Sequence, residues 1–141
     1  MISGDCQVSV WDIAGQEQYR PTWKDILEEA DIVFLVTDSQ KENVYKTLDL
    51  YRINKKYAEE STSFYIIANK QDLPNSLTPQ DIQQIFHLPT YNMVAINPKN
   101  RKKMLTILRE KVGEKIGQQL TIVESKLSGK EQIFSILTSI E

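Results

Sequence analysis

Two short apolar runs constrain the fold of this chain more than any other feature. The segments Asp31–Asp38 and Ser63–Asn69 are apolar almost throughout, without the alternation of a half-exposed strand. Runs of this kind are typical of parallel strands whose two faces are both covered by helices. They are far too short to span a bilayer. Because parallel strands need long crossover connections, the runs predict an α/β fold.

Further strand and helix patterns extend this prediction. Polar and apolar residues alternate over Gln7–Trp11, which favours a strand with one covered face, and Tyr91–Ile96 is a weaker strand candidate. Residues 21–29, 41–57 and 102–116 have apolar side chains at helical spacing, and Thr78-Pro79 is typical of a helix start. The alternation of strands and helices predicts an open, mostly parallel sheet flanked by helices, with ligands at the carboxyl ends of the strands.

The last part of the chain has a weaker pattern. Residues 118–127 could extend the preceding helix, Ser128-Gly129 is a break, and Glu131–Ile140 has apolar residues at the spacing of an amphipathic helix. We therefore predict one domain over residues 1–117 and a helical extension over residues 118–141. That extension packs on the domain or, alternatively, docks to a partner or a membrane surface.

Composition limits the possible functions. The net charge of −2 argues against a dedicated nucleic-acid binder, and one histidine with one cysteine argues against a zinc site. Cys6 allows no internal disulfide and fits a reducing compartment. The start of the chain has neither the basic residues nor the apolar core of a secretory signal. We expect a cytoplasmic protein, with a peripheral membrane association as a further option.

A first group of candidate site residues follows the Gln7–Trp11 segment. Asp12 is expected at the end of that strand, where a carboxylate can hold Mg²⁺ opposite nucleotide phosphates, usually through water. Gly15 permits a close backbone approach to a terminal phosphate, and Gln16 can orient an attacking water. Taken alone, a group of this kind is more often a polar strand-to-helix turn that needs a glycine for its geometry.

A second group follows the Ser63–Asn69 run. Asp72 could accept hydrogen bonds from the N1–H and exocyclic amine of guanine, which adenine cannot supply, so a site built around it would reject adenine. The aliphatic stem of Lys70 could lie over the base, and Asn69 could tie neighbouring loops together. The simpler alternative is a solvated loop after a strand. Two such groups at the ends of strands in one sheet favour a shared crevice.

These motifs resemble those of small GTPases of the Ras superfamily, nearest to the Arf/Sar-like branch. Val10-Trp11-Asp12 and the segment from Gln16 to Trp23 resemble the Arf-like switch II, although Ala14 and Glu17 are closer to the Ras-like form. The segment Ala68–Asn75 resembles the Arf-like guanine-recognition loop almost letter for letter, and the likeness spans roughly residues 5–115. The resemblance implies Asp12 at magnesium, Gly15 at the γ-phosphate, Gln16 as the hydrolytic residue, and Asn69, Lys70 and Asp72 at guanine.

The resemblance also implies a further guanine loop, which falls on Asn97-Pro98-Lys99. In the family, the backbone N–H of the middle residue donates to the base, and Pro98 has no N–H. Asn97 and Lys99 are therefore assigned to an altered base contact, with the N–H of Lys99 as a shifted donor. The alternative is a turn that only starts a helix, which Asn-Pro also favours.

A larger departure concerns the front of the family's fold. The chain contains no Gly-x-x-x-x-Gly-Lys-Ser/Thr phosphate loop, and no switch I region, first strand or first helix of the family is recognisable. That first strand normally lies in mid-sheet, between the strands expected at Val8–Trp11 and Asp31–Asp38. Either those two strands pair directly, or another segment fills the gap.

Three hypotheses follow. In the first, the chain is an N-terminally incomplete part of an Arf-like GTPase that binds GTP or GDP with Mg²⁺, hydrolyses GTP and switches conformation. In the second, it is a non-hydrolysing relative that serves as a binding module. In the third, a second chain completes it. We favour the first, and we expect these 141 residues alone to bind nucleotide and Mg²⁺ weakly or not at all and to be inactive as an enzyme.

Expected partners follow from the resemblance and from charge. An exchange factor, a GTPase-activating protein and effectors would contact the switch II segment from Gln16 to Trp23. The predicted last helix is rich in basic residues, which we interpret as a solvated face, with attraction to an anionic membrane as the less favoured alternative. These basic residues are Lys99, Arg101, Lys102, Lys103, Arg109, Lys111 and Lys115.

Overall fold

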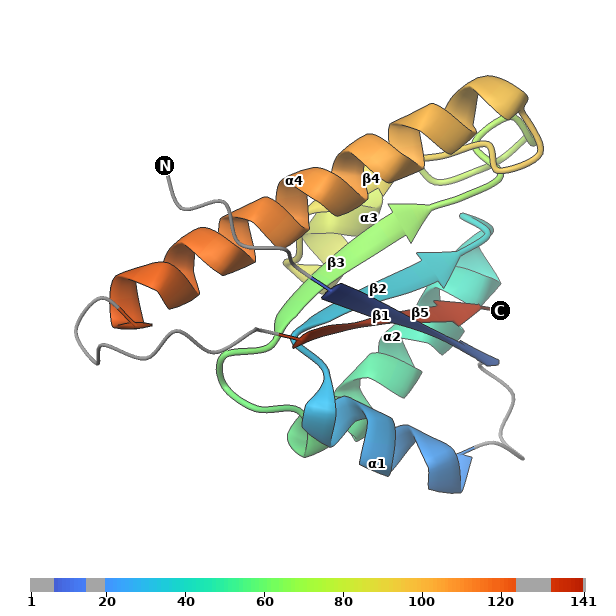
Figure 1. Ribbon diagram of the computed structural model, residues 1–141. Coiled ribbons are helices and arrows are strands. Elements are labelled where there is room, and N and C mark those ends of the chain that lie inside the picture. Colours follow the sequence, from blue (N-terminus) through green and yellow to red (C-terminus); the bar gives the residue numbers. More distant parts are fainter. Residues whose placement is uncertain (1–6, 15–19, 124–132, 141) are drawn as a thin grey trace.

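A single parallel sheet forms the centre of the protein. The computed structural model describes residues 7–14, 20–123 and 133–140. Its strands follow the order β1-β5-β2-β3-β4, and each pairs in parallel with its neighbours (Figure 1). Their bounds are β1 Gln7–Ala14, β2 Ile32–Thr37, β3 Ser63–Ala68, β4 Thr90–Asn92 and β5 Ile133–Ile140.

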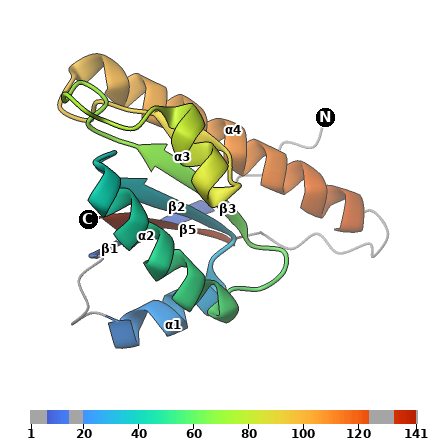
Figure 2. The ribbon, with the colours of Figure 1, turned by 180° about the vertical axis from the view of Figure 1, so that it is seen from behind.

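Helices cover both faces of this sheet. The long helix α4 crosses one face, while α1, α2 and α3 lie on the other, as the view from behind shows (Figure 2). This arrangement confirms the predicted α/β class. The helices are α1 Arg20–Glu29, α2 Lys41–Asn54, α3 Pro79–Phe86 and α4 Pro98–Val123, with a short 3₁₀ turn, η2, at Lys55–Tyr57 after α2.

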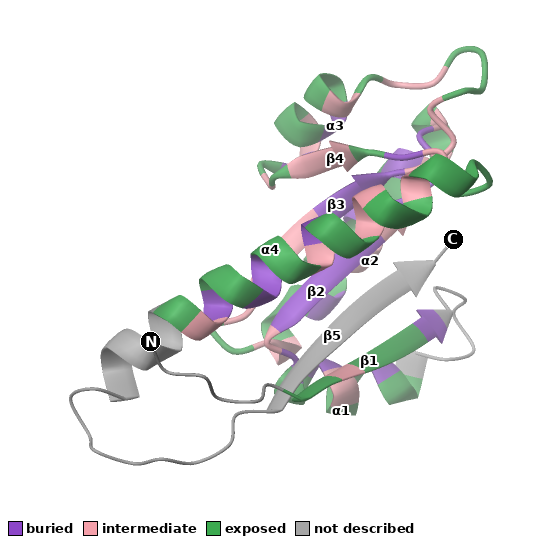
Figure 3. Cartoon of the chain, turned by 45° about the horizontal axis from the view of Figure 1, so that its top comes forward, coloured by how far each residue is buried: buried purple, intermediate pink, exposed green. Residues whose placement is uncertain are grey.

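The two apolar runs of the sequence form the most buried strands. In β2, alternate residues face opposite layers: Val33 and Leu35 pack toward α1 and α2, while Ile32 and Phe34 pack toward α4. Figure 3 shows that burial is concentrated on β2 and β3, whereas β1 is exposed along most of its length. Because helices cover both faces of these strands, their sequences are continuous apolar runs.

The prediction of an amphipathic helix over Glu131–Ile140 is wrong for the part that the structure describes, Ile133–Ile140. This segment forms strand β5, which lies between β1 and β2 and fills the gap in mid-sheet. Its register pairs Ile136 with Val10 on one side and with Ile32 on the other. Short apolar runs fit helical and strand patterns alike. Here the backbone groups of two neighbouring strands need partners, and a strand supplies them.

Several other boundaries differ from the prediction. Strand β1 continues to Ala14, so Asp12 lies within the strand and not at its end. Strand β4 is shorter than expected. Helix α4 begins before the predicted 102–116 and continues to Val123, which agrees with the possible extension over residues 118–127. Trp23 is buried, whereas Trp11 on β1 is 53% exposed.

The basic helix is only partly a solvated face. Lys99, Arg101, Lys102 and Arg109 are exposed, as predicted. Lys111 and Lys115 are buried against the sheet, which the sequence interpretation did not foresee. Among the described helices, none is both long and apolar enough to cross a bilayer.

Candidate functional site

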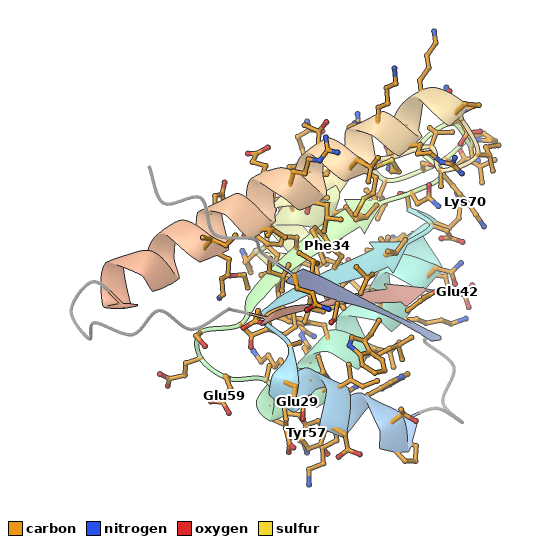
Figure 4. All side chains as sticks on the ribbon, viewed as in Figure 1. Glu29, Phe34, Glu42, Tyr57, Glu59 and Lys70 are labelled. Atoms are coloured by element: carbon orange, nitrogen blue, oxygen red, sulfur yellow. The ribbon has the colours of Figure 1, made fainter. Side chains whose placement is uncertain are left out.

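The predicted base-recognition residues gather at the carboxyl edge of the sheet. Asn69, Lys70 and Asp72 follow directly after β3, and Asn97 and Lys99 lie at the start of α4. Figure 4 shows Lys70 beyond the end of β3, at the end of the molecule where α4 begins. Gly15 and Gln16 lie outside the described residues.

Asn69 joins the two loops that form this group. Its side-chain Oδ1 accepts a hydrogen bond of 2.9 Å from the backbone N–H of Ala95, in the turn after β4. Its own backbone N–H donates to the carbonyl of Thr37 at the end of β2, at 2.8 Å. One residue therefore connects the ends of three neighbouring strands, which agrees with the predicted tying role for Asn69.

The backbone after Asn69 turns sharply. Lys70 has a φ of 57°, in the left-handed region that non-glycine residues seldom adopt. The N–H of Leu73 closes the turn by donating to the carbonyl of Lys70 at 3.1 Å. Lys70 is half-buried, while Asp72 is exposed and accessible to a ligand. The turn thus presents both polar side chains at the edge of the sheet.

A buried polar network behind this turn was missed by the sequence interpretation. The Gln71 Nε2 donates to Ser39 Oγ at 2.7 Å and to the carbonyl of Leu77 at 2.9 Å. Ser39 Oγ in turn donates to the carbonyl of Asn69 at 2.6 Å. Gln71 lies inside the recognised motif, but nothing in the local sequence connects it to Ser39, which is 32 residues away.

The loop that was predicted to be a second guanine contact forms a helix start. Helix α4 begins at Pro98, and the Oδ1 of Asn97 accepts a hydrogen bond from the N–H of Lys99 at 3.0 Å. This is the geometry of an N-cap side chain satisfying an otherwise unpaired helix donor. The N–H of Lys99, considered above as a shifted donor to guanine, is therefore already engaged by Asn97.

The residue predicted to hold magnesium stands apart from the base loops. Asp12 is exposed on β1. The described residues include no group of three or more histidine, cysteine or acidic side chains that could hold a metal ion. A lone carboxylate fits Mg²⁺ only where phosphate and water oxygens complete the coordination.

An apolar cavity of about 50 Å³ lies between α1, α2 and the sheet. Trp23, Leu27 and Val33 are among its lining residues. None of the predicted site residues is among the described residues that line it. We therefore do not assign the cavity to the candidate site.

Comparison with known proteins decides the family. The model of the ADP-ribosylation factor family matches residues 1–127. The chain belongs to this family. The assignment agrees with the parallel sheet and with the two loops that Asn69 joins, and it confirms the resemblance seen in the motifs.

Curated relatives are similar over part of their length. ADP-ribosylation factor-like protein 4D of Mus musculus is 32% identical over 77 residues, covering 53% of this chain and 38% of the relative. The 4C protein of Homo sapiens is 38% identical over 77 residues, covering 52% and 40%. ADP-ribosylation factor-like protein 2 of Dictyostelium discoideum is 34% identical over 96 residues, covering 61% and 48%. The matches thus cover less than half the length of these relatives.

Proposed function

We propose that this Arf-family chain recognises guanine nucleotides and serves as part of a GTP-dependent molecular switch. The observation that carries the proposal is the hydrogen bond from the Ala95 N–H to Asn69 Oδ1, which holds the two base-recognition loops together. Membership of the Arf family supports a GTP-binding switch in general. The loops lie at the carboxyl edge of a parallel sheet, where open α/β folds bind ligands.

Base selection would rest on Asp72. Its exposed carboxylate would accept from the N1–H and the exocyclic amine of guanine, whereas adenine offers no matching pair of donors. The stem of Lys70 would cover one face of the base. Asn97 and Lys99 would contribute less, because the Asn97 Oδ1 already accepts a hydrogen bond from the Lys99 backbone N–H.

The phosphate end of the nucleotide would meet the residues after β1. In this proposal Gly15 lies at the γ-phosphate, Gln16 orients the hydrolytic water, and Asp12 holds Mg²⁺ through water. The metal would neutralise phosphate charge. The segment from Gln16 to Trp23 would serve as the contact for an exchange factor, a GTPase-activating protein and effectors, and the protein would act in the cytoplasm or at a membrane surface.

The decisive experiment compares GDP with ADP on this chain by calorimetric titration. We expect GDP to bind with weaker than micromolar affinity, because the sequence contains no phosphate loop. We also expect GDP to bind clearly more tightly than ADP. Asp72→Asn should remove that preference, and Asp49→Asn, an exposed aspartate on α2, should preserve it. Equal binding of GDP and ADP by the wild type would refute the proposed function. Micromolar or tighter binding of GDP would refute only the expectation that this chain binds GDP weakly.

A further inference from the structure

The proposed base-recognition turn is held by side chains whose polar groups bond within the protein. Ser39 is fully buried at the end of β2, and Gln71 is half-buried within the turn. The side-chain amide of Gln71 donates to the Ser39 hydroxyl, and that hydroxyl donates to the Asn69 carbonyl. This chain of donors ends on the residue that joins the two loops.

The same two residues also fix the backbone on either side. The Gln71 N–H donates to the carbonyl of Met93 after β4, and the Ser39 carbonyl accepts from the N–H of Leu77. Together with the Gln71 side chain bonding to the Leu77 carbonyl, these contacts tie together the segments that follow β2, β3 and β4. A loss at one contact would therefore loosen all three segments.

Backbone strain explains why such a network is needed. Ser39 and Lys70 both have left-handed backbone conformations, with φ values of 67° and 57°. A non-glycine residue in this region is strained and persists only where the surrounding structure holds it in place. The hydrogen bonds between Ser39, Gln71 and Asn69 hold the backbone in these conformations. Without them, the turn would relax and Asp72 would move relative to Ala95.

We propose that Ser39 and Gln71 are positioning residues for guanine recognition, which hold Asn69, Lys70 and Asp72 in the geometry that the base requires. The inference rests on the proposed function, and it adds two residues that the base-recognition motif does not explain. Their effect reaches the nucleotide through the shape of the turn and not through a direct contact.

The first test needs no nucleotide. Gln71→Met preserves the length of the side chain but removes both donations from its amide. We expect amide hydrogen exchange at Asn69 and Ala95 to become about tenfold faster, since the two partly buried hydrogen bonds of the Gln71 amide are lost. Gln80→Met, an exposed glutamine on α3, is the matched control and should leave both rates unchanged.

The second test measures recognition. Gln71→Met should weaken GDP binding about tenfold and leave ADP binding unchanged, so that the preference for guanine falls. Ser39→Ala should act in the same direction, and it serves as the second variant if Gln71→Met does not fold. If the wild type prefers GDP and both variants retain this preference in full, the positioning role is overturned and the proposed function is not. A wild type without any preference would overturn the proposed function and the inference with it.

Discussion

Two buried lysines on α4 illustrate how environment decides the state of a single residue. Burial alone would lower the pKa of Lys111, but the Tyr91 hydroxyl and the Glu114 carboxylate outweigh it and raise that pKa above its usual range. The Lys111 Nζ lies 5.1 Å and 5.4 Å from the ring centroids of Tyr65 and Tyr91. For Lys115, burial is the largest influence and lowers the pKa, although its Nζ donates to the Ser61 carbonyl and to Ser63 Oγ. Lys111 is thus held as a cation that stabilises the fold.

Lys111→Ala should lower the free energy of unfolding by about 1–2 kcal/mol, because it removes the cation–π contacts and the buried stem. Lys102→Ala, an exposed position on the same helix, should cost much less. The pKa of Lys111 is higher in the folded state than its ordinary value of 10.5. The contribution of its charge to the free energy of unfolding is therefore fully present below pH 10.5, and it is lost only as pH rises through the folded-state pKa. Urea denaturation at pH 6 and pH 9 should therefore give the same difference between wild type and variant. Equal losses for Lys111→Ala and Lys102→Ala would contradict this assignment.

At the scale of the element, α3 shows how local sequence sets the ends of a helix. Thr78 lies before the first turn, and its hydroxyl accepts from the N–H of Asp81 at 3.1 Å. Pro79 occupies the first helical position, where its missing N–H costs nothing. His87 ends the helix in the left-handed conformation, with its N–H bonded to the Gln83 carbonyl. The helix begins and ends where these residues place it.

Thr78→Ala should lower the free energy of unfolding by about 1 kcal/mol, since the N–H of Asp81 loses its partner. Thr78→Ser retains a capping hydroxyl and should restore most of the stability. Thermal unfolding followed by circular dichroism would measure both variants. If the alanine and serine variants melted together, the cap would contribute nothing to stability.

The sequence predicted elements well wherever its pattern had one physical meaning. The start of α3 followed from Thr78-Pro79, and β2 and β3 followed from continuous apolar runs of the kind that is typical of doubly covered parallel strands. For Ile133–Ile140 the spacing fitted a helix, because sequence alone does not reveal that two strands need a partner between them. For the same reason the motif indicated Asn69, Lys70 and Asp72 but not Ser39, whose contact with Gln71 depends on the fold.

At the scale of the whole molecule, β5 holds the sheet together. Within the described sheet, β1 pairs with β5 alone, and β5 joins it to β2. Pairing of Gln7–Ala14 with Ile133–Ile140 connects segments separated by nearly the whole length of the chain. Such non-local pairing carries a large loop-closure cost and should form late in folding. The position of Asp12 relative to the base-recognition loops therefore depends on β5.

Ser135→Pro tests this dependence through the backbone alone. Ser135 lies opposite Ser9 in the register of β5 and β1, within a strand that is paired on both sides. Proline supplies no N–H to the ladder of a strand that has neighbours on both sides, so we expect a loss of about 3 kcal/mol or more in the free energy of unfolding. Ser135→Ala keeps the N–H and serves as the matched control, with a much smaller loss.

The strands in which amide hydrogen exchange accelerates should be as informative as the loss in the free energy of unfolding. Amide hydrogen exchange should accelerate most along β1 in the proline variant, because β1 has β5 as its paired strand, and less along β3, which retains its pairing with β2 and β4. A proline variant as stable as the alanine variant would place Ile133–Ile140 outside the sheet in solution. The strands β1 and β2 would then have to pair directly, and Asp12 would lie one strand closer to the base-recognition loops.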